Sequence, residues 1–198
     1  AAKNPCAAKN PCAANPCAAN PCAANPCAAA AAVNLSKNEA VAAYGCAKKD
    51  MQAGYAKSGD KTAKSYGSWT NYSAQPYPSA THGQRFVNNY ANGTAKNYGR
   101  FEQSGKMPVG SILAKDSFTV GAKGQVAAGP LFLMEKMSAG FNKASGDWRY
   151  TMIMPTGAVA GTTKGKGSKT VEFCIACHAA VAEAQDHMFF LPEEFRRK

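Results

Sequence analysis

Residues 174–178 read Cys-Ile-Ala-Cys-His, a pair of cysteines separated by two residues and followed at once by a histidine. This C-x-x-C-H pattern is typical of covalent haem attachment, in which both thiols add to haem vinyl groups and the imidazole reaches the iron. A thioredoxin-type redox pair would need a preceding strand in a βαβ context, and a zinc site would need a second Cys or His pair. The flanking sequence has neither, so we expect one covalent haem c held by Cys174 and Cys177, with His178 as iron ligand.

The sequence around this motif predicts an α+β fold. Short alternating runs predict strands at 85–90, 111–120, 131–137 and 149–154. Helices are expected at 93–103 and at 171–184, the second of which carries the motif. Ser36 and Glu39 form a capping-box pattern that begins an amphipathic helix over 37–57, and Gly59 supplies its stop. We therefore expect an antiparallel β-sheet domain with a few helices and a C-terminal haem-attachment helix.

The start of the chain is a low-complexity repeat. It reads AAKNPC twice and then AANPC three times, with cysteines at positions 6, 12, 17, 22 and 27. Asn-Pro favours turns, and a segment without large side chains has almost nothing to bury. We predict a Cys-rich tail over 1–33, an N-terminal amphipathic helix over 34–65 and a haem domain over 66–198.

Composition limits the partners of the chain. The 198 residues carry a net charge of +11, but no run of about 18 apolar residues exists, so no transmembrane segment is expected. The lysines are scattered between Gly, Ser and Thr, as at Lys164, Lys166 and Lys169, and no nucleic-acid recognition motif accompanies them. We therefore expect a solvated basic surface that favours an acidic redox partner protein over nucleic acid.

The cysteines also indicate a compartment. Covalent haem attachment and six further cysteines among the eight in the chain fit an oxidising, extracytoplasmic environment. The chain begins Ala-Ala without a charged or apolar leader, which we interpret as a periplasmic protein whose signal peptide has been removed.

The group on the second side of the iron decides the function, and the sequence leaves it open. Histidine candidates are His82 and His187, each of which could equally be a hydrogen-bonded surface residue. Methionine candidates, which could equally be core residues, are Met107, Met134, Met137, Met152, Met154 and Met188. A sixth ligand would make a six-coordinate electron carrier, whereas an open face would bind small molecules.

Strand periodicity adds four candidate pocket residues. In the strand over 111–120 a period of two puts Lys115 and Phe118 on opposite faces. Glu135 shares a face with apolar residues; if that face lines the haem pocket, burial would raise its pKa and allow proton exchange with a substrate. Otherwise Glu135 is a strand-edge acid paired with a nearby Lys. Phe118 and Phe132 are candidates for an aromatic cap over the haem, or for core positions.

The run from Arg85 to Phe190 resembles cytochrome P-460 and its sister, the beta-type cytochrome c prime. The matching pieces, in order, are RFVNNY, FEQSGKMPVG, GSILAKDSF, GPLFLMEKM, GDWRYTMIMPTG and EFCIACHAAVAEAQDHMFF. The resemblance implies a compact antiparallel-sheet domain, paired as a homodimer, with a five-coordinate iron that binds small nitrogen species. In the P-460 branch the lysine of the G-x-x-x-x-K strand is cross-linked to the porphyrin and hydroxylamine is oxidised, so the resemblance makes Lys115 a catalytic candidate beside Glu135, which the strand pattern supplies. In the sister branch an apolar, aromatic pocket binds nitric oxide without that chemistry.

Deleting residues 1–32 should leave the haem absorption spectrum and the thermal unfolding midpoint unchanged, because a segment without large side chains contributes neither core nor iron ligand. The measurement compares the full chain with the truncated chain, both expressed with haem maturation. Failure of the truncated chain to incorporate haem would contradict a dispensable tail.

Overall fold

The computed structural model describes residues 33–197, so the cysteine repeat lies outside the described residues. The described part forms an eight-stranded antiparallel sheet in the order β1-β3-β4-β6-β7-β8, with β2 beside β3 and β5 beside β4. The strands are β1 (Thr70–Asn71), β2 (Tyr77–Ser79), β3 (Arg85–Ala91), β4 (Ile112–Val120), β5 (Val126–Ala128), β6 (Leu131–Lys136), β7 (Trp148–Ile153) and β8 (Val159–Thr162). The predicted α+β class with an antiparallel sheet is confirmed.

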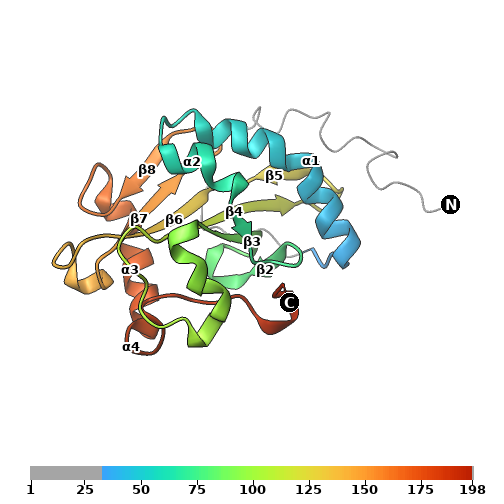
Figure 1. Cartoon of the computed structure of the whole chain (residues 1–198). Coiled ribbons are helices and arrows are strands. Elements are labelled where there is room, and N and C mark those ends of the chain that lie inside the picture. The colour runs from blue at the N-terminus through green and yellow to red at the C-terminus, as the bar shows by residue number, and fades with distance from the viewer. Residues whose placement is uncertain (1–32, 198) are drawn as a thin grey trace.

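Helices cover both faces of this sheet (Figure 1). The α-helices are α1 (Lys37–Ala56), α2 (Lys61–Ser65), α3 (Glu172–His178) and α4 (Ala182–Gln185). The longer α1 and the adjacent α2 lie over one face, whereas α3, α4 and the 3₁₀ segment Gly93–Gln103 lie on the other side (Figure 1). Shorter 3₁₀ turns are Tyr66–Ser68, Ala80–His82, Lys143–Ser145, Ser168–Val171, Ala179–Val181 and Glu193–Phe195.

The capping box predicted for the first helix is present. The Ser36 hydroxyl accepts from the Glu39 amide, and the Glu39 carboxylate accepts from the Ser36 amide at 2.8 Å. The four predicted strands are found with ends shifted by at most two residues. The expected helix over 93–103 is instead a 3₁₀ segment interrupted by non-helical backbone at Ala95 and Phe101.

The helix expected over 171–184 is also broken. It consists of the short α3 and α4 with a 3₁₀ turn between them. None of the residues in these three pieces is buried, so no packed apolar face holds them in one long helix. The haem motif still lies on helical backbone, because α3 contains it entirely.

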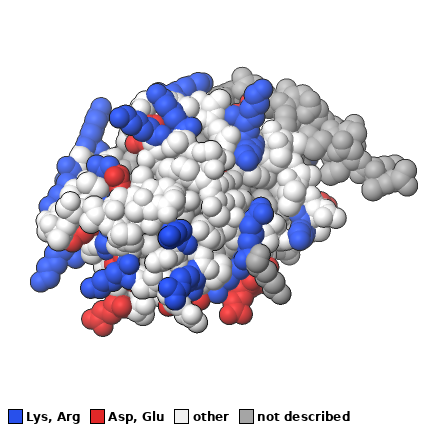
Figure 2. All heavy atoms as spheres, viewed as in Figure 1, with Lys and Arg blue, Asp and Glu red and all other residues white. Residues whose placement is uncertain are grey.

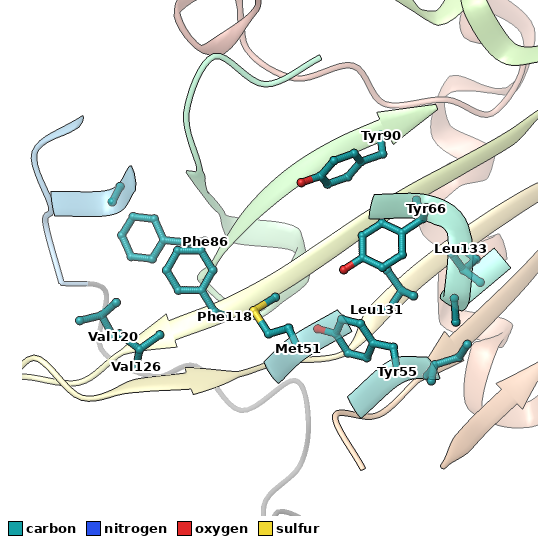
Figure 3. Packing of buried hydrophobic residues seen from close by; sticks show 14 residues of the cluster. Met51, Tyr55, Tyr66, Phe86, Tyr90, Phe118, Val120, Val126, Leu131 and Leu133 are labelled. Atoms are coloured by element: carbon teal, nitrogen blue, oxygen red, sulfur yellow. The ribbon is translucent and has the colours of Figure 1, made fainter. Parts of the chain in front are cut away.

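The sheet separates two apolar cores. The first core lies between the sheet and the two N-terminal helices, and Figure 3 shows its side chains; it includes Met51, Tyr55, Tyr66, Phe86, Tyr90, Phe118, Leu131 and Leu133. The second core lies on the opposite face beneath the C-terminal segment; it includes Tyr77, Val87, Tyr98, Leu113, Trp148, Tyr150, Met152 and Met188. Successive residues of β3, β4, β6 and β7 therefore alternate between the cores, as a period of two requires.

A buried carboxylate fixes this alternation at the centre of β4. Asp116 is fully buried in the first core and accepts hydrogen bonds from Tyr44 (2.7 Å), Tyr66 (3.2 Å) and Asn88 (3.1 Å). Burial raises its pKa to about 6, while these donors act in the opposite direction. Because Asp116 is directed into the first core, its neighbour Lys115 is directed to the opposite face.

None of the helices within residues 33–197 is long and apolar enough to cross a membrane.

Replacing Phe118 by Ala should destabilise the fold by about 3–5 kcal/mol, because its fully buried ring packs between Tyr44 and Phe86. Denaturant unfolding measures the change. Val41→Ala is the matched control: Val41 is 46% exposed on α1, and its loss should cost no more than about 0.5 kcal/mol. An equal loss of stability in both variants would contradict this account of the first core.

Candidate functional site

A cavity lies on the second-core face of the sheet, beneath the C-terminal segment. The space within it, counted together with the open solvent at its mouth, is about 790 Å³. Its lining includes Thr81, His82, Asn89, Tyr98, Lys115, Phe132, Met134, Tyr150, Phe173, Cys174, Cys177, His178, Met188 and Phe189. Segments more than 100 residues apart in the sequence therefore meet at this site.

The haem motif enters the cavity from α3. Cys177 and His178 follow Cys174 by three and four residues, which is the spacing of neighbours on one helix face. All three residues line the cavity. The structure thus brings the two thiols and the imidazole of the motif to a single concave surface.

A hydrogen bond and two aromatic rings fix the position of the His178 imidazole. Its Nδ1 lies 2.7 Å from the carbonyl oxygen of His187, so Nδ1–H donates to that oxygen and Nε2 carries the lone pair. The rings of Tyr150 and Phe189 both lie 5.2 Å from the imidazole, centroid to centroid. Burial lowers the pKa of His178 to about 4, so the imidazole is neutral at pH 7 and suited to bind a metal.

Lys115 reaches the same cavity from the middle of the sheet. Its neighbours across the strands are Asn89 on β3 and Phe132 on β6, and all three line the cavity. Burial lowers the pKa of Lys115 to about 8, although the nearby Cys177 thiol acts in the opposite direction. The Lys115 amine is therefore still mostly protonated at pH 7, with a minor neutral and nucleophilic fraction that grows as the pH approaches 8.

His82 also lines the cavity, from the 3₁₀ turn before β3. Its Nδ1 lies 2.9 Å from the Ser79 hydroxyl and 3.2 Å from the Thr81 hydroxyl, and its ring meets Phe132 edge-on at 4.9 Å. Burial lowers its pKa well below the usual value, and the Lys115 charge acts in the same direction. The two hydroxyls lie within hydrogen-bond distance of Nδ1. Nε2 is therefore the ring nitrogen of His82 that can contact a bound ligand.

Two of the predicted pocket residues lie on the other face. Phe118 is fully buried in the first core, where it stacks on Phe86. Glu135 forms an ion pair with Arg149, its neighbour across the strands, on the face that carries Leu131 and Leu133. The periodicity that grouped Glu135 with these leucines is correct, but α1 covers their face and the cavity lies behind it. Glu135 is therefore paired with a cation, as the alternative held, but the cation is Arg149 rather than a lysine, and β6 lies inside the sheet between β4 and β7.

The other residues considered as a second iron ligand also differ in whether they line the cavity. Met134 and Met188 line the cavity, whereas Met107 and Met152 are buried in the core around it. The His187 ring is buried beside Gly146, and this residue serves His178 through its backbone carbonyl.

Sequence reasoning missed several cavity residues. Tyr150 lies two residues from Trp148 and Met152 on β7, so strand periodicity could have grouped it with them. The Tyr98 hydroxyl accepts from Nδ2 of the Asn89 side chain at 2.7 Å, a contact between β3 and the 3₁₀ segment that no local pattern indicates.

A second cavity lies on the α1 side of the sheet and offers a different chemistry. Its lining includes Lys48, Trp69, Asn71 and Arg197, and none of the described residues that line it is a cysteine or histidine. Of these two cavities in the described part of the chain, the first therefore has the ligands that a c-type haem requires.

The first cavity also carries exposed aromatic side chains that suit such a group. Phe173 is 44% exposed and Phe189 is 37% exposed at its edge, and both lie beside the motif. A flat apolar macrocycle would cover aromatic surface of this kind, while the thiols and the imidazole would hold it.

An antiparallel α+β domain with two thiols, an imidazole and an aromatic cleft defines a haem-binding cytochrome. The family model for cytochrome P460 matches residues 63–190, more than half of the chain, and the chain belongs to this family. A comparison with curated proteins finds no match. The matched region contains every strand of the sheet, whereas α1 lies before it.

Replacing Glu135 by Gln should leave the haem absorption spectrum unchanged and cost no more than about 1 kcal/mol of stability, because its ion pair with Arg149 is partly exposed and lies on the face away from the cavity. Absorption spectroscopy and denaturant unfolding test both parts. Phe132→Ala, on the cavity face, should alter the spectrum instead. A change in the haem spectrum of the Glu135 variant would contradict this placement and show that Glu135 acts on the haem site.

Proposed function

We propose that this chain is a periplasmic monohaem c-type cytochrome whose iron has an open side that binds small nitrogen species such as nitric oxide or hydroxylamine. The observation that carries the proposal is the convergence of Cys174, Cys177 and His178 with Lys115 on one cavity in a member of the cytochrome P460 family.

Attachment follows from the chemistry of the motif. Each thiol adds across one vinyl group, so that a C–S bond forms and the thiol hydrogen moves to the neighbouring vinyl carbon without an external oxidant. His178 presents Nε2 to the metal because its Nδ1–H is engaged by the His187 carbonyl. When bound, the haem supplies an iron that takes a small ligand and exchanges an electron.

The remaining cavity residues suit a small, neutral ligand. Among the described lining residues, Lys115 is the side chain with a cationic form near pH 7, and none is an Asp or Glu. Phe132 narrows the space beside Lys115, and the neutral His82 can exchange a hydrogen bond with a bound molecule. Such a pocket admits nitric oxide or hydroxylamine without an ion pair.

The surface is consistent with an acidic redox partner. Lys and Arg side chains are spread around the visible face, with few acidic groups between them, rather than gathered in one patch (Figure 2). The net charge of +11 would steer an acidic protein toward the molecule. We further propose a homodimer, as the family resemblance implies.

A six-coordinate electron carrier is the alternative function. The observation that favours it is His82, because its Nε2 could ligate iron from a position in the same cavity as His178. A sixth ligand of this kind would close the site to small molecules.

The denatured protein should retain one haem, since two thioether bonds to Cys174 and Cys177 survive unfolding. The absorption spectrum of the reduced protein should be high-spin and should change when carbon monoxide is added. Haem that extracts into acidic organic solvent would refute covalent attachment. A low-spin spectrum that does not change when carbon monoxide is added would support the six-coordinate alternative.

Replacing Lys115 by Leu tests whether the protein is an enzyme. If the Lys115 nitrogen is bonded to the porphyrin edge, a bond whose formation needs an external oxidant such as peroxide, the variant should lose hydroxylamine oxidation and keep nitric oxide binding. Its reduced spectrum should shift toward that of an ordinary c-type haem. Mass spectrometry of the haem peptides detects the bond, and Lys49→Leu, exposed on α1, is the control. Haem peptides with the two cysteine attachments alone would assign the protein to gas binding.

A further inference from the structure

The loop after α4 has an unusual backbone. Asp186 and His187 both adopt left-handed conformations, with φ values of 46° and 63°. Neither is a glycine, and such angles are uncommon for residues with side chains. Both residues are also buried, at 8% and 7% exposure. Two consecutive residues of this kind persist only where the surrounding structure holds them in place.

Asp186 is held from three directions. Its carboxylate accepts from the Met107 amide at 2.9 Å and from the Lys136 ammonium at 2.7 Å. Its backbone carbonyl accepts from the Trp148 indole at 2.7 Å. These donors belong to the loop before β4, the end of β6 and the start of β7, so the loop is tied to the sheet at three points.

Lys136 is fully engaged in this arrangement. Its ammonium also donates to the Gly146 carbonyl at 2.8 Å and lies 5.1 Å from the centre of the Trp148 ring. The side chains of Lys136 and Asp186 are only 12% and 6% exposed. A buried ion pair persists when hydrogen bonds satisfy both partners, as they do at this site.

The residue after Asp186 supplies the hydrogen bond to the haem motif. The His187 carbonyl is the acceptor for His178 Nδ1–H. The His187 ring packs against Gly146, where a β-carbon would lie 2.4 Å from His187 Cδ2. The position of this carbonyl therefore depends on the Asp186 anchor on one side and on Gly146 on the other.

We propose that the Lys136–Asp186 pair positions the iron ligand: it fixes the His187 carbonyl, and through that carbonyl the orientation and basicity of His178. The inference rests on the proposed function only in taking His178 as the ligand. Hydrogen bonds from a ligating imidazole to an acceptor raise the basicity of the ligand, and their loss changes metal affinity by about 10- to 100-fold. Lys136 and Asp186 are positioning residues, because they act through His187.

The test uses the full haem-loaded protein with Asp186→Asn and Lys136→Met. Both variants should raise the reduction potential, because a less basic His178 stabilises the ferric state less. A tenfold change in the relative affinity for the two oxidation states corresponds to about 59 mV for a one-electron couple. The iron–histidine stretching frequency of the reduced protein should fall in parallel, and Lys136→Arg should restore much of both values.

Glu102→Gln is the matched control, since it removes a second ion pair, with Arg196, whose side-chain hydrogen bonds do not include Asp186, His187 or Lys136. A potential and a stretching frequency in the Asp186 and Lys136 variants equal to those of the control would overturn the inference. Loss of haem from both variants and from Lys136→Arg would also overturn it, because the pair would then serve folding rather than ligand position. Failure of the proposed function is visible earlier, as wild-type protein without covalently bound haem.

Discussion

The site depends on the alternation of side chains across β4. Asp116 is directed into the first core, where Tyr44, Tyr66 and Asn88 donate to it, and Lys115 is consequently directed into the cavity. A one-residue slip in the pairing of β4 with its neighbours would exchange these two side chains. It would leave a carboxylate beside the haem motif and a lysine in the first core. The core beneath α1 therefore determines which side chain of β4 enters the cavity on the opposite face of the sheet.

Local signals in the sequence predicted much of the fold and the centre of the site. The C-x-x-C-H run, the capping box at Ser36 and the four alternating strands depend on neighbouring residues alone, and the fold class and the family were both confirmed. Periodicity also separated Lys115 from Phe118 correctly. It could not say which face α1 covers, because that depends on contacts distant in sequence. Glu135 was proposed for the cavity for this reason and lies on the opposite face.

The cavity differs from an ordinary polar active site in its electrostatics. Burial is the leading cause of the lowered pKa values of His82, Lys115 and His178, and all three shifts favour the neutral form. Among the described lining residues no carboxylate is present to counter this effect. Neutral nitrogens act as metal ligands, nucleophiles and hydrogen-bond partners, which their protonated forms cannot do in the same way. The burial that accompanies the aromatic cleft therefore also lowers the pKa values of the nitrogen groups within it.

The C-terminal segment links this chemistry to the stability of the sheet. His178 and the carbonyl that accepts its hydrogen bond are only nine residues apart, yet no side chain of α3 or α4 is more than partly buried. Local packing therefore cannot hold the two groups in register. The rigidity comes instead from Asp186, whose partners belong to the loop before β4 and to β6 and β7. Removing one partner of a buried ion pair costs about 3–5 kcal/mol, a large share of the 5–15 kcal/mol that stabilises a typical domain. That cost is the penalty for leaving the remaining charge buried and unpaired, so both partners must be present for the loop at Asp186 to stay tied to the sheet. The geometry of His178 therefore follows from the sheet as well as from the helix that carries it.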